Sequence, residues 1–78
     1  MIDKEELEEV CKEILLKALE ARYEGHKLVD ISFYVKKLPH RNPKLVKFAL
    51  WYLQDKELLK DCEITSKGVD HVLRNFET

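Results

Sequence analysis

The sequence predicts a mainly helical protein with one small β-hairpin, and three observations lead to this class. Apolar side chains recur at helical spacing through most of the 78 residues. Residues 58–65 instead hold two short apolar runs around a polar pair, which is the pattern of a hairpin. Capping residues such as Asp3, Asn42 and Ser66 stand where helices should begin. The length suits a single small domain over residues 1–78, with three to four helices.

The first helix should begin near Asp3, because Asp3 and Glu6 have the spacing of a capping box. Its apolar residues repeat every three or four positions, and Gly25 should end it in the left-handed conformation. Acidic residues crowd the first turns, where the helix dipole favours them. Leu16 and Tyr23 fall outside the apolar stripe. They are either simply exposed or part of a second contact surface.

Two further helices should be joined by a short turn. Asp30 caps a helix over residues 31–37, and two prolines bound the turn after it. Asn42 and Pro43 start the next helix, which should run to about Asp55. At 100° per residue, Lys44, Lys47 and Gln54 share its outer side. Its apolar side holds Leu45, Val46, Ala49, Leu50, Tyr52 and Leu53.

The last third of the chain predicts a hairpin and a final helix. Residues 58–60 and 63–65 are the two short strands, joined at Asp61 and Cys62. Ser66 caps a helix with an apolar stripe of Val69, Val72, Leu73 and Phe76. Because the hairpin should cover the helix before it, Trp51 is predicted to be buried; the alternative is an exposed aromatic patch with Phe48. The predicted core comprises Leu15, Leu19, Phe33, Leu45, Ala49, Leu53, Ile64, Val69, Val72 and Leu73.

Charge is distributed unevenly along the chain. The formal net charge is −1, but residues 25–54 carry +5 while residues 1–24 carry −4 and residues 55–78 carry −2. No acidic residue occurs from position 31 to position 54. One positive segment between two negative ones predicts a local site for an anionic partner, although solvated helix faces also carry such charges.

Several function classes find no support in the sequence. No nucleophile stands beside a base, no glycine loop could cradle a phosphate, and we expect no enzyme, no cofactor and no small-molecule ligand. Cys11 and Cys62 form no metal-binding motif, so neither a metal site nor a disulfide is expected. No apolar run is long enough to span a membrane, and the acidic N-terminus is unlike a signal peptide. We therefore expect a cytoplasmic protein.

The later residues carry a resemblance to a known family. LWYLQDKELLK, residues 50–60, resembles the end of the third helix and first wing strand of winged-helix proteins. EITSKGVDHVL, residues 63–73, resembles their second wing strand and the entry to the final helix, as in bacterial and archaeal regulators. The resemblance covers roughly residues 5–76 and implies a winged helix-turn-helix fold. The wing departs from a long basic one, because its tip holds only Asp61 and Cys62.

This resemblance implies that the chain binds double-stranded DNA, as a small transcriptional regulator whose third helix enters the major groove. Arg41 could then contact a guanine, lysines would contact phosphates, and free N–H groups at the start of that helix would add to the anion site. We further expect a homodimer formed through the first helix, with some contribution from the last. The alternative is a winged-helix protein-interaction module without DNA binding. The predicted DNA-binding residues are Lys36, Lys37, His40, Arg41, Asn42, Lys44, Lys47 and Lys60.

Overall fold

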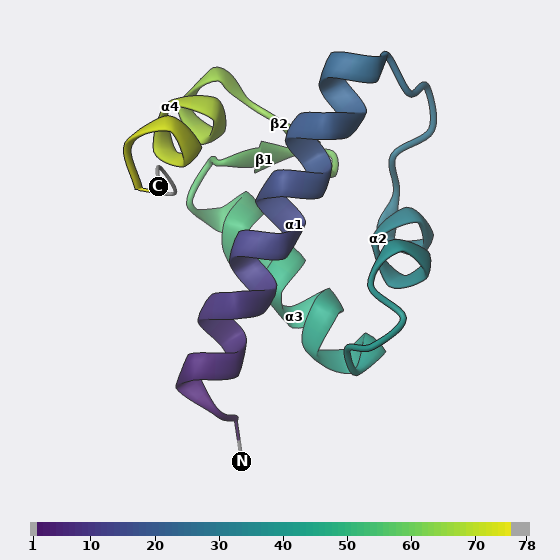
Figure 1. Ribbon diagram of the computed structural model, residues 1–78, viewed down its shortest axis with the longest axis vertical. Helices are drawn as coiled ribbons and strands as arrows, with labels where there is room; N and C mark the ends of the chain where they lie inside the picture. The colour runs from purple at the N-terminus through teal and green to yellow at the C-terminus, as the bar shows by residue number, and fades with distance from the viewer. Residues whose placement is uncertain (1, 76–78) are drawn as a thin grey trace.

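The computed structural model describes residues 2–75, which form four helices and a two-stranded antiparallel hairpin (Figure 1). The mainly helical class with one small hairpin is therefore confirmed. The helices also begin and end close to the predicted residues, since their limits are set by local capping groups. The elements are α1 (Lys4–Glu24), α2 (Ile31–Lys37), α3 (Pro43–Asp55), β1 (Leu59–Lys60), β2 (Glu63–Ile64) and α4 (Ser66–Asn75).

The long helix α1 runs across the other elements and packs most extensively on α3 (Figure 1). Its first turn is capped by Asp3, whose carboxylate accepts from the backbone N–H groups of Glu5 and Glu6. Gly25 ends it at φ 73°, a left-handed conformation that glycine adopts without strain. Both predicted ends of α1 are confirmed. Leu16 and Tyr23 are exposed on its outer side.

The hairpin is fixed to the helices at its tip. β1 and β2 pair with Leu59 opposite Ile64, and the two-residue turn Asp61–Cys62 has φ values of 50° and 68°. The Tyr34 hydroxyl donates to the Cys62 carbonyl, while the Cys62 N–H donates to Gln54 Oε1 over 2.9 Å. The prediction placed Gln54 on the outer side of α3. It is instead half-buried, because it supplies the acceptor for this turn.

The N-cap of α4 is Thr65 rather than the predicted Ser66. Thr65 Oγ1 accepts from the Gly68 N–H at 3.0 Å, and the same hydroxyl donates to the backbone carbonyls of Glu57 and Leu58. Ser66 is exposed and forms the first residue of the helix. One threonine therefore joins the start of α4 to the loop that precedes β1.

A single core connects α1, α2, α3, the hairpin and α4, and it confirms most of the predicted core. Leu15, Ala49, Leu53, Ile64 and Val72 are buried, and four further predicted residues are partly buried against them: Leu19, Phe33, Leu45 and Val69. The predicted burial of Leu73 is wrong, because α4 turns Gly68 and Val72 inward and leaves Leu73 59% exposed. Phe76 lies outside the described residues. Tyr34 was expected only as an apolar contact of the second helix and not in the predicted core, and it is completely buried at the hairpin tip.

Candidate nucleic-acid interface

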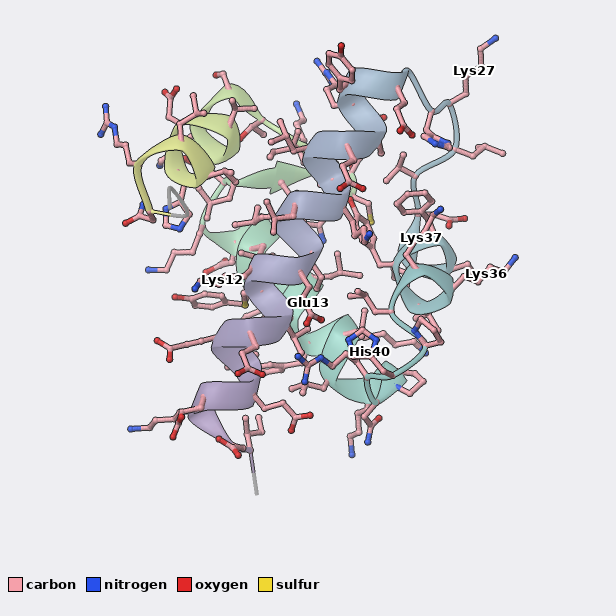
Figure 2. The ribbon with its side chains drawn as sticks, in the orientation of Figure 1. Lys12, Glu13, Lys27, Lys36, Lys37 and His40 are labelled. Carbon is pink, nitrogen blue, oxygen red and sulfur yellow. The ribbon has the colours of Figure 1, made fainter. Side chains whose placement is uncertain are left out.

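The basic residues of the predicted site flank the turn between α2 and α3. Lys36 and Lys37 end α2, whereas Lys44 and Lys47 occupy the first turns of α3, and all four are exposed. Within residues 2–75, Lys36, Lys44 and Lys47 form no ion pair. Figure 2 shows Lys36 extending away from the body of the protein. These ammonium groups can therefore meet an external anion without first breaking an internal pair.

Arg41, unlike these lysines, forms ion pairs within the protein, because its guanidinium is turned toward α1. Nη2 lies 2.7 Å from Glu13 Oε2 and 3.2 Å from Glu9 Oε1, and Nε donates to Glu13 Oε1 over 3.0 Å. Nη1 is also 3.6 Å from Glu6 Oε2. This placement differs from the predicted guanine contact. Sequence reasoning missed it because the acidic partners lie about thirty positions upstream, which only the crossing of α1 over the turn reveals.

The Arg41–Glu13 pair is the main electrostatic feature of the turn. The hydrogen bond from Arg41 lowers the pKa of the Glu13 carboxyl, and it raises the pKa of the Arg41 guanidinium in return. His40 lies on the same side, with Nε2 3.4 Å from Glu13 Oε1 (Figure 2). His40 is exposed, so it can face a ligand as well as Glu13. The acidic start of α1 thus holds the turn in place.

Asn42 acts as the cap of α3, as predicted. Its oxygens bind the backbone N–H groups that would otherwise be available to an anion. Its side-chain oxygen accepts from the Lys44 N–H at 2.8 Å, and its carbonyl accepts from the N–H groups of Leu45 and Val46. Pro43 has no N–H to offer. The expectation of free backbone donors at this end of α3 is therefore wrong. Its positive character rests on Lys44 and Lys47 and on the helix dipole.

Lys60, the last predicted cation, lies on β1 beside the hairpin tip rather than in the turn. Its side chain is exposed, and it forms no ion pair among the described residues. The tip itself does not extend outward, because the bonds to Tyr34 and Gln54 hold it against α2 and α3. The hairpin therefore offers one exposed lysine, and no long projecting loop.

An aromatic pair lies on the outer side of α3, one to two turns beyond the lysines. Phe48 is 40% exposed and Trp51 is 58% exposed, and their ring centroids are 5.6 Å apart. The predicted burial of Trp51 is therefore wrong. The hairpin and α1 cover the opposite side of α3, where Ala49, Leu50 and Leu53 are buried. Trp51 lies at helical spacing from Lys44 and Lys47, and this spacing was the signal in the sequence that Trp51 lies on the outer side of α3.

The described residues also bear on three other kinds of feature, namely a metal site, a disulfide and a membrane span. Among residues 2–75, no three His, Cys, Asp or Glu side chains are grouped to hold a metal ion. Cys11 and Cys62 are both free thiols. None of the helices in this part of the chain is sufficiently long and apolar to cross a membrane.

Comparison with known proteins returned no family model, no curated protein and no solved structure that matches this chain.

Proposed function

We propose that the chain is a winged-helix domain that binds double-stranded DNA through the edge formed by α2, the following turn and α3. The observation that carries this proposal is the placement of four exposed lysines, Lys36, Lys37, Lys44 and Lys47, around one turn. No carboxylate lies in the surrounding segment from residue 31 to residue 54. Glu9 and Glu13 of α1 are paired with the Arg41 guanidinium.

In this proposal α2 braces α3, and the N-terminal turns of α3 enter the major groove. Lys44 and Lys47 contact phosphates and base edges at the groove, whereas Lys36, Lys37 and Lys60 contact flanking phosphates. His40 and Asn42 lie in the turn between them. Arg41 acts indirectly, because it fixes the turn against α1 through Glu13. Regulation of transcription is the function that a small domain of this type would serve.

The experiment measures binding to random duplex DNA at several salt concentrations. The wild type should bind more weakly as salt rises, because phosphate contacts release counterions. The double variant Lys44→Ala/Lys47→Ala should lower the slope of log K against log salt by roughly 1.8, about 0.9 for each lost contact. Arg74→Ala on α4 is the matched control, since Arg74 is exposed and far along the chain from this edge.

Two results would contradict the proposal. One is a wild type that shows no salt-dependent affinity for duplex DNA even at low salt. The other is a Lys44→Ala/Lys47→Ala variant whose salt slope equals that of Arg74→Ala. Arg41→Ala supplies an independent check, because it should reduce thermal stability without reducing the slope by a full phosphate contact.

The proposed binding form is a homodimer joined through α1. Leu16 and Tyr23 lie seven residues apart on the outer side of this helix, and Tyr23 is 91% exposed. A two-fold axis there would let paired α3 helices reach successive major grooves, about 34 Å apart. Leu16→Glu/Tyr23→Glu should then give a monomer by sedimentation, whereas wild type that stays monomeric at high micromolar concentration would exclude the dimer.

A second candidate function is a winged-helix protein-interaction module. The exposed Phe48 and Trp51 favour it, because paired aromatic side chains on a surface helix are typical of protein-binding sites. Phe48→Ala/Trp51→Ala separates the two functions. If the pair serves a protein partner, this variant should keep the salt slope of DNA binding and lose capture of that partner. If the wild type binds no DNA, this module replaces the DNA-binding proposal.

A further inference from the structure

An apolar cleft opens between α1, the end of α3 and the start of α4, away from the turn that carries the basic edge. Its volume is about 700 Å³, within the range typical of small-molecule sites. Leu15, Leu53 and Leu58 form a buried floor, and Leu7 and Cys11 of α1 form a partly buried wall. An apolar surface of this kind gains free energy when a hydrocarbon group displaces water from it.

The cleft is lined by more basic than acidic side chains among the described residues, unlike the acidic helix that forms one side of it. Within residues 2–75, Lys12, Lys56, Lys67 and His71 line the cleft together with a single acid, Glu8. The Lys67 ammonium lies 3.3 Å from Glu57 Oε1, but both side chains are well exposed. An exposed pair of this kind contributes little to stability, so a bound anion can replace it at small cost.

We propose that this cleft binds an anionic amphiphile, namely a medium-chain carboxylate of the fatty-acid class. The hydrocarbon chain lies on the leucine floor, and the carboxylate accepts hydrogen bonds from Lys56 and Lys67 at the rim. An apolar floor with a cationic rim matches both parts of such a molecule, whereas a cationic amphiphile would meet like charge. The site is separate from the proposed DNA edge, and binding here does not depend on DNA binding.

Cys11 gives a direct report on the occupancy of the cleft. Burial raises the pKa of the Cys11 thiol to about 11, with a smaller contribution from Glu8, so its alkylation should be slow but measurable. A chain lying on the floor would cover this sulfur and slow the reaction further. Cys62 is the internal control, because it lies at the hairpin tip, where its carbonyl accepts from Tyr34, and does not line the cleft.

The experiment titrates the full chain with decanoate by calorimetry, below the concentration at which decanoate forms micelles. Decanoate should bind saturably at one site for each chain. Octanoate should bind roughly tenfold more weakly, because two buried methylene groups are lost. Decyltrimethylammonium should bind at least about tenfold more weakly than decanoate, because it replaces a charge-assisted pair by repulsion at the rim.

The rim is tested with Lys56→Gln/Lys67→Gln, which should weaken decanoate binding roughly tenfold. Lys36→Gln/Lys37→Gln removes the same charge from α2, outside the cleft, and should leave decanoate binding unchanged. Circular dichroism establishes that both variants are folded. Saturating decanoate should slow alkylation of Cys11 at least about fivefold in the wild type, as expected for a sulfur covered by ligand.

Three results would overturn the proposal. Equal affinity for decanoate and decyltrimethylammonium would show that the rim charge has no role. Unchanged alkylation of Cys11 under saturating decanoate would place the ligand elsewhere. Absence of saturable decanoate binding to the wild type would remove the site altogether.

Discussion

Arg41 connects the turn before α3 to three acidic side chains of α1. Its side chain is only 15% exposed, and Glu13 holds it through two oxygens. Since Arg41 lowers the pKa of Glu13, this carboxyl stabilises the folded state when it is ionised. That contribution is present above the pKa of an unfolded glutamate, about 4.3, and is lost as the pH falls through the lower pKa of the folded state.

This pair predicts the shape of the acid-unfolding profile. The melting temperature of the wild type should fall more steeply below about pH 4 than that of Glu13→Gln, which has no carboxylate to protonate. Thermal melts followed by circular dichroism between pH 7 and pH 2 measure the difference. Glu20→Gln, an exposed change on the same helix, should follow the wild-type profile. Parallel profiles for wild type and Glu13→Gln would contradict this role.

A second prediction concerns the hydroxyl of Tyr34. Tyr34→Phe removes the hydroxyl that donates to the Cys62 carbonyl and leaves that buried acceptor unpaired. The free energy of unfolding should fall by about 1–3 kcal/mol. Burial also raises the pKa of the Tyr34 phenol, so the wild type should lose stability as the pH rises above about 10. Urea unfolding at pH 7 and at pH 10.5 tests both statements, and a variant as stable as wild type would refute the first.

These residues also show what the sequence alone can predict. Asp3 and Asn42 were assigned correctly, because a capping side chain bonds to backbone groups two or three positions away. The hydrogen-bond partners of Arg41 and Tyr34 were not predicted, because these partners lie 28 positions away and depend on how the helices cross. Local chemistry therefore predicts where the helices begin and end, whereas the state of a candidate site residue depends on tertiary contacts.

At the scale of elements, α4 depends on the absence of a side chain at one position. A Cβ on Gly68 would stand 2.2 Å from the Leu58 carbonyl oxygen and 2.7 Å from Ile64 Cγ1. Glycine lowers helix propensity, and by that measure alone Gly68 costs α4 a little stability. The structure explains why glycine occupies this position, because α4 crosses the hairpin so closely that only glycine fits.

Gly68→Ala should therefore destabilise the protein, although the same change in an open helix stabilises it. The expected loss is about 1–3 kcal/mol, as for overpacking of a tight interior. Chemical denaturation followed by circular dichroism measures it. Asp70→Ala, at an exposed position of the same helix, should change stability by less than about 0.5 kcal/mol. A stabilised Gly68→Ala would show that α4 can move away from the hairpin.

At the scale of the whole molecule, all of the helices contribute to one core, and two leucines test its extent. Leu53 is 2% exposed at the centre, whereas Leu73 is 59% exposed on α4. The sequence assigned both to the core, because apolar spacing identifies a helix face but cannot fix how far the covering elements reach. Within Ser66–Asn75 the last buried residue is Val72, and this limit arises from packing.

Leu53→Ala should lower the free energy of unfolding by about 2–5 kcal/mol, from the lost contacts and the cavity left behind. Leu73→Ala should change it by less than about 0.5 kcal/mol, because most of that side chain already meets water. For so small a domain the first loss is a large part of the total stability. Denaturant unfolding of the pair provides the comparison, and equal losses would contradict the described packing of α4.

Trp51 is the only tryptophan of the chain, and its exposure determines what optical spectroscopy can report. An indole that already contacts water in the folded state should emit at nearly the same wavelength after unfolding. Intrinsic fluorescence is therefore a poor probe of unfolding for this protein. The same indole should shift its emission to shorter wavelength once another molecule covers it. It is thus a built-in reporter of events at the outer side of α3, and it needs no attached dye.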